Sequence, residues 1–134
     1  MNAKRVELLQ QMLETELAGV KIYQTALECA RNPPLREEWT KYLQQTQNRV
    51  EIMRDLLTKI GVGPAEPKGS LVVRFIVQLL LHAMTRAKGG GDSAATEVVA
   101  CECVVFAKTK DHQNWSLLSN CAEEAEEPLA SALR

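Results

Sequence analysis

Two prolines separate two long segments of helical apolar periodicity, and this feature constrains the fold of the 134-residue chain more than any other. On both sides of Asn32-Pro33-Pro34, apolar residues recur every three or four positions. A proline pair cannot continue a helix, but it can open the next helix at its first turn. Two helices of about 25 residues joined by such a short turn must pack as an antiparallel hairpin. The chain therefore begins as a helical bundle.

Glycines and capping residues set the other boundaries. The second helix is expected to end near Gly61 and the third near Gly89, while Asp92 or Ser93 is a candidate N-cap for a fourth helix. Asp111 is a candidate N-cap for a fifth. The helices predicted in this way cover about 4–31, 34–60, 70–88, 92–110 and 112–127. All of them are expected to form a single domain spanning residues 1–134.

Composition agrees with an all-α protein. Hydrophobic residues make up 46% and charged residues 25%, which excludes a disordered chain, and aromatics are only 4%, which disfavours a sheet protein. The chain holds 16 Lys and Arg against 17 Asp and Glu, so no basic excess is available for nucleic acid. The first residues have no apolar run typical of a signal peptide, and the four cysteines suggest free thiols. We therefore expect a soluble, cytoplasmic protein.

The segment Leu71–Met84, LVVRFIVQLLLHAM, is apolar around most of its circumference. It is too short to span a bilayer, and Arg74 and Gln78 interrupt it, so we expect no membrane helix. A helix of this kind is either buried between other helices or covered by a second subunit. The last predicted helix is short, and one chain would then leave its bundle incomplete. We therefore predict a homodimer, with Leu71–Met84 as a candidate interface.

Two acidic residues fall within apolar helix faces. Glu16 occupies one position of the apolar series of the first helix, and Glu102 lies among the apolar residues of the fourth. Burying a carboxylate without a partner is costly, so two inward glutamates need an explanation. The second helix places Thr46 at the centre of its apolar face and Arg49 at the edge. We expect Arg49 to pair with Glu16 in the interior, with Glu102 as a candidate second partner.

This pattern resembles the ferritin-like superfamily of rubrerythrin and bacterioferritin type. The phrase ELAGVKIY resembles the first helix of that family, with Glu16 in the ligand position and Tyr23 seven residues later, and Glu102 matches the glutamate of its third bundle helix. The resemblance implies an antiparallel four-helix bundle, with an extra helix from Leu71 in the crossover between the second and third bundle helices. It also implies a site for two iron or manganese ions.

The sequence departs from the family at most other ligand positions. Where Glu-x-x-His belongs, TQNR puts Thr46 in place of the carboxylate and Arg49 in place of the histidine. The last helix has no histidine, and Glu124 is the acidic residue nearest its inward face. His82 and His112 are isolated and are expected at the surface or at a helix end.

Three hypotheses follow. The first is a ferritin-like bundle without a functional di-metal site or other cofactor, which acts as a structural or partner-binding protein and not as an enzyme. The alternative is a di-iron or di-manganese carboxylate protein with an incomplete ligand set, which binds or oxidises iron through Glu16, Glu102 and Glu124. In the third, an apolar cavity between helices, or the apolar face of the Leu71 segment, binds a small ligand or a partner helix.

Overall fold

The structure, a computed structural model, describes residues 3–61 and 71–122, and all secondary structure in these residues is helical. The four helices of the described residues are α1 (Ala3–Cys29), α2 (Pro33–Lys59), α3 (Leu71–Gly89) and α4 (Ser93–Ala122). The prediction of an all-α bundle is confirmed.

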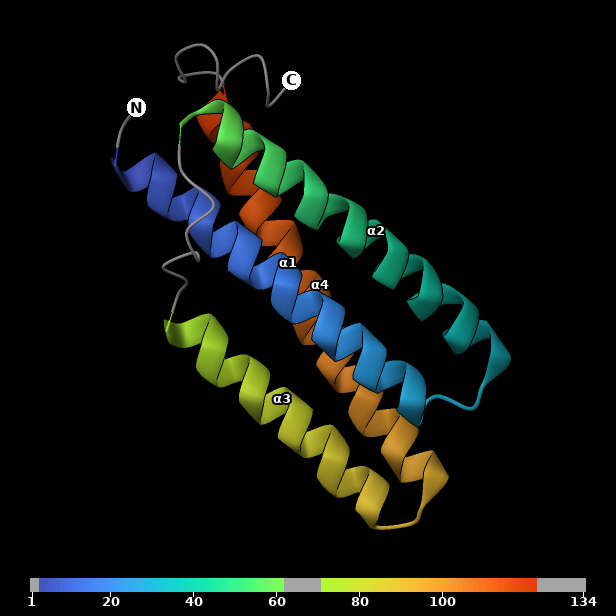
Figure 1. The fold of residues 1–134 in the computed structure, drawn as a ribbon. Helices are drawn as coiled ribbons and strands as arrows, with labels where there is room; N and C mark the ends of the chain where they lie inside the picture. The colour runs from blue at the N-terminus through green and yellow to red at the C-terminus, as the bar shows by residue number, and fades with distance from the viewer. Residues whose placement is uncertain (1–2, 62–70, 123–134) are drawn as a thin grey trace.

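Helix α1 occupies the middle of the bundle (Figure 1). It packs against α2, α3 and α4, while α3 also packs against α4. Helices α1 and α2 form one antiparallel hairpin, and α3 and α4 form a second. Within the described residues, the backbones of α2 and α4 do not approach each other closely, so these two helices meet only through side chains. The segment from Leu71 was expected to be an extra helix in a crossover. It is α3, which packs against both α1 and α4 as a member of the bundle.

The α1–α2 turn is built as the prolines predicted. The side chain of Asn32 accepts a hydrogen bond from the amide of Leu35, and two prolines fill the first turn of α2. The carboxylate of Glu97, on α4, accepts from the amides of Arg31 and Asn32 at 2.7 and 2.9 Å, and these bonds lower the pKa of Glu97. The turn is therefore tied both to α2 and to the beginning of α4.

The predicted boundary between a fourth and a fifth helix is wrong, because α4 continues through Asp111. Asp92 does act as an N-cap, with Oδ1 accepting from the amides of Ala94 and Ala95 at 3.1 Å. Asp111 does not, since its oxygens accept instead from Arg49 and Trp115. No glycine or proline stands near Asp111 to stop the helix.

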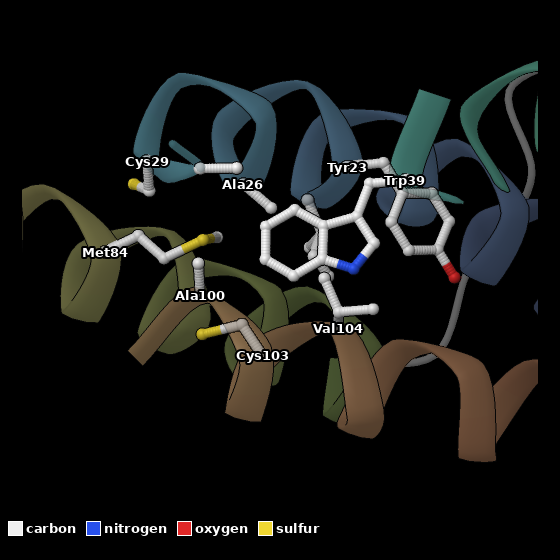
Figure 2. Packing of buried hydrophobic residues seen from close by; sticks show 10 residues of the cluster. Tyr23, Ala26, Cys29, Trp39, Met84, Ala100, Cys103 and Val104 are labelled. Carbon is white, nitrogen blue, oxygen red and sulfur yellow. The ribbon is translucent and has the colours of Figure 1, made fainter. Parts of the chain in front are cut away.

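Two apolar clusters fill the interior. In the larger, the indole of Trp39 reaches from α2 between α1 and α4, next to Tyr23 and Val104, and Met84 of α3 closes the same core (Figure 2). The second cluster joins the first half of α1 to the second half of α2. Its buried members are Leu9, Met12, Leu13, Val50, Met53, Leu56 and Leu57. The apolar faces predicted for the first two helices are thus the buried faces.

Helices α3 and α4 leave apolar side chains in solvent. We call this surface the α3–α4 apolar face. It comprises Val72, Phe75, Ile76, Leu79, Val98, Val105 and Phe106. Helix α4 buries the opposite stripe, which includes Thr96, Ala100, Cys103, Val104 and Asn114. Among the helices that the structure describes, none is both long enough and apolar enough to cross a membrane.

Candidate polar site

A polar cluster lies where α1 faces α4 and the second half of α2. Its first member is Glu16, which α1 buries to 2% exposure, as its place in the apolar series predicted. Tyr23, two helical turns along the same face, is equally buried. Its ring meets that of Tyr42, on α2, with the centroids 5.9 Å apart. Helix α1 therefore presents a carboxyl group and a phenol to a water-poor interior.

Helix α4 supplies the partners of Glu16. The indole nitrogen of Trp115 donates to Oε1 of Glu16 at 2.9 Å and to Oδ1 of Asp111 at 3.1 Å. Asp111 and Trp115 are four residues apart on α4, so one helix face holds both groups against the same point of α1. One N–H of Trp115 therefore bridges the two carboxyl groups, and their proximity favours a proton on one of them.

Helix α2 adds the positive charge. Nη1 of Arg49 lies 2.9 Å from Oδ2 of Asp111, in a half-buried ion pair. The predicted partners of Arg49 are thus wrong: the arginine pairs with Asp111 instead of bonding directly to Glu16 or Glu102. Asp111 receives Arg49 on one oxygen and Trp115 on the other, so both of its oxygens are satisfied.

Thr46 is buried, as predicted, but it belongs to helix packing. Its hydroxyl donates to the carbonyl of Tyr42 at 2.7 Å, within α2. Its methyl group faces Gly19 of α1, where an added Cβ would lie only 3.2 Å from Thr46 Cγ2. This close approach of α1 and α2 leaves little space for a side chain at position 19.

Burial raises the pKa of Glu16 to about 8, with a further rise from the hydrogen bond and the negative charge of Asp111. The indole of Trp115 and the charge of Arg49 act in the opposite direction, but more weakly. With this pKa, Glu16 is mostly protonated at neutral pH. Burial and the same two carboxyl groups also raise the pKa of Tyr23.

A second set of polar bonds continues the α1–α4 contact. Nδ2 of Asn114 donates to Oγ1 of Thr15 at 3.1 Å, and Lys110 donates to Oδ1 of Asn114 at 2.9 Å. Thr15 in turn donates to the carbonyl of Gln11. Since every buried side-chain polar atom in the described residues has a partner, the interface is polar without being strained.

The other predicted carboxylates do not join this cluster. Glu102 is exposed on α4, between Val98 and Phe106 of the apolar face, so the prediction that it points inward is wrong. Both faces of α4 are apolar, and the sequence alone does not show which one is buried. Glu124 lies outside the described residues. His82 and His112 are exposed, as expected.

Asp111 and Trp115 are the site residues that the sequence analysis missed. Asp111 looked like a local cap because aspartate is common at helix starts. The available signal was the spacing of Asp111, Asn114 and Trp115, which continues the stripe of Cys103 and Val104 along α4. Following that stripe would have placed all three against α1.

The donor set does not fit a di-metal centre. Within the part of the chain that the structure describes, no three His, Cys, Asp or Glu side chains converge where an ion could be held. Glu16 and Asp111 are the carboxyl groups that meet, and Arg49 already neutralises Asp111. Two hard cations would need more anionic ligands and no fixed guanidinium beside them.

Comparison of the chain with protein-family models, with curated proteins and with solved structures finds no match.

Stability should fall as pH rises through the pKa of Glu16. A carboxyl group whose pKa is higher in the folded state contributes stability that is complete below its unfolded pKa and is lost as pH rises through the folded value. For a shift from 4.5 to about 8, we expect a loss of about 2–4 kcal/mol between pH 5 and pH 9, measured by urea unfolding. Glu16→Gln keeps a neutral side chain of the same shape and should flatten this profile. Identical profiles for both proteins would contradict the proton assignment.

The ion pair between Arg49 and Asp111 should couple in a double-mutant cycle. Arg49→Met leaves the carboxylate of Asp111 half-buried beside Glu16, so we expect it to cost about 1–3 kcal/mol in urea unfolding. Asp111→Asn should remove most of that cost when the two changes are combined. Arg54→Met is the matched control, since Arg54 pairs with Glu51 in solvent and should change stability by less than about 0.5 kcal/mol. Strictly additive effects at positions 49 and 111 would show that the pair contributes nothing.

Proposed function

We propose that this chain is a partner-binding helical bundle, and that its partner is a second copy of itself docked on the α3–α4 apolar face. The observation that carries the proposal is the exposure of large apolar side chains there. Phe75, Leu79 and Phe106 are 64%, 67% and 61% exposed, respectively. Such a surface is unusual on a monomer, and contiguous patches of this kind mark interaction sites.

Exposed apolar residues of the two helices line a common groove. On α3, Val72, Phe75, Ile76 and Leu79 follow at spacings of three and four, and so share one side of the helix. Phe106 of α4 lines the same groove as Val72 and Ile76, which joins the two helices. This groove has a volume of about 320 Å³ and a floor of small residues from α1. A docked helix could place an apolar side chain in it.

The polar and charged side chains on and beside this face suit a two-fold dimer. His82 and Arg86 are exposed on α3, and Glu102 is exposed on α4. In an isologous pair, the same patch serves both copies, so α3 of one copy can lie against α4 of the other. Glu102 of each copy would then face His82 and Arg86 of the other copy. The apolar residues between these side chains would be covered.

We also propose that the bundle is ferritin-like, with a proton and an arginine where the family holds metal ions. Glu16 and Tyr23 in α1 and Arg49 in α2 support this relationship, since the two α1 residues are buried and the charge of Arg49 acts on both. On this view the protein has no resident iron or manganese and is not an enzyme. The cysteines of the described residues are free, which suits the cytoplasm, the location that we propose.

A metal titration tests the absence of a di-metal site. We expect protein purified without added metal to contain far less than stoichiometric iron or manganese by elemental analysis. Titration with Mn²⁺ should leave the unfolding temperature unchanged, because Arg49 opposes a second cation beside Asp111. Arg49→Gln, which removes that charge, is the variant in which weak binding would appear first. Stoichiometric metal in the unmodified protein would favour the di-metal alternative.

The dimer is tested by light scattering coupled to gel filtration. We expect a mass of twice 14.9 kDa at micromolar concentration. Leu79→Glu should give a folded monomer, because it puts a charge at the centre of the face without disturbing the core. Ile52→Glu is the matched control, since Ile52 is 54% exposed on α2, away from this face, and this variant should remain dimeric. A monomeric parent, or a dimeric Leu79→Glu, would refute the proposal.

A further inference from the structure

The separation of α2 from α4 leaves an open cleft beside the polar cluster, which we call the α2–α4 cleft. Its volume is about 410 Å³, within the range of small-molecule sites. It is lined by Arg49, Ile52, Lys108, Asp111, His112 and Trp115. None of these residues belongs to the α3–α4 apolar face, so the cleft is independent of the proposed dimer.

The charge balance of the cleft favours an anion. Asp111 is the one carboxylate in its lining, and both of its oxygens already accept from Arg49 and Trp115. The positive charge of Lys108 is therefore uncompensated within the lining. Nζ of Lys108 lies 3.9 Å from the ring centroid of Tyr42, which is outside the lining, so the ammonium group turns away from this ring to reach an anion in the cleft. His112 adds a second polar group on the same side of α4.

The interior carboxyl group does not cancel this charge. Glu16 lies behind Asp111 and Trp115, and burial and its hydrogen bond to Asp111 favour its neutral form. The formal charges of Arg49, Lys108 and Asp111 thus add up to one positive charge near the rim of the cleft. The neighbouring Glu16 is buried and neutral. Glu38 lies beside Tyr42, outside the lining, and its carboxylate offsets part of the charge of Lys108; within the lining, an anionic group would face no carboxylate other than Asp111.

The other walls of the cleft are apolar. Ile52 is 54% exposed and would gain from being covered by a ligand. The indole nitrogen of Trp115 is bonded to Glu16 and Asp111, so the orientation of the ring is fixed. A fixed aromatic ring beside an exposed aliphatic side chain suits a flat, apolar body.

We propose that the α2–α4 cleft binds a small aromatic monocarboxylate, with its ring between Ile52 and Trp115 and its carboxylate on Lys108 and His112. The ring replaces water on two apolar walls, and the carboxylate supplies the negative charge that the cleft lacks. Charge-assisted hydrogen bonds to the ammonium group provide the preference for an anion over its neutral amide.

Benzoate, benzamide and cyclohexanecarboxylate are the probes for this site. The readout is the shift of the Trp115 indole N–H signal in ¹⁵N-correlated NMR spectra, assigned with Trp115→Phe. We expect benzoate to move this signal saturably. Benzamide should bind about tenfold more weakly because it lacks the charge. Cyclohexanecarboxylate keeps the charge but not the flat ring, and should fall between them.

Lys108→Gln should weaken benzoate binding about tenfold, while Lys41→Gln, an exposed lysine of α2 outside the cleft, should leave it unchanged. Circular dichroism verifies that both variants are folded. The Leu79→Glu variant should bind benzoate like the parent, which separates this site from the dimer. Equal binding of benzamide, an equal effect of both lysine changes, or no saturable shift would overturn the proposal.

Discussion

The hydrogen bonds that Trp115 donates to Glu16 and Asp111 are the interaction on which the centre of the bundle depends. Helix α1 is packed by three other helices, so the carboxyl group of Glu16 cannot reach water. Its charge would have to be compensated, or it must keep its proton. The structure combines both solutions: burial favours the protonated form of Glu16, and an arginine from α2 neutralises Asp111. Removing Trp115 takes away the indole donor of Glu16, and removing Asp111 takes away the carboxylate that Arg49 binds.

The same arrangement fixes the distance between α2 and α4. Their backbones stay apart, and the gap is bridged by Arg49 with Asp111 and by Lys108 above the ring of Tyr42. The indole of Trp39 fills the gap at the other end of the bundle. Long side chains reach across the gap to the polar cluster, while the two helix backbones stay apart. The α2–α4 cleft is therefore a consequence of the interaction that stabilises the interior.

The sequence predicted the first half of the molecule well and the second half less well, for one physical reason. Helices α1 and α2 each have an apolar face, and they end shortly before Pro33 and Gly61, respectively, so periodicity and chain breakers agree. Helix α4 is apolar on both sides, and periodicity cannot distinguish its buried stripe from its exposed one. Glu102 was therefore assigned to the wrong face. Asp111 shows a second limit, because a local capping role and a long-range ion pair use the same side chain.

The position of Glu102 bears on how two copies could associate. An acidic residue in the middle of an apolar stripe makes burial of that stripe costly unless a cation meets it. An association that slides α4 over another apolar surface would leave Glu102 without a partner. One that brings the exposed His82 and Arg86 of α3 opposite Glu102 would not. Glu102 therefore weakens nonspecific contacts more than it weakens the two-fold arrangement. It adds specificity to a surface whose apolar contacts alone would allow many orientations.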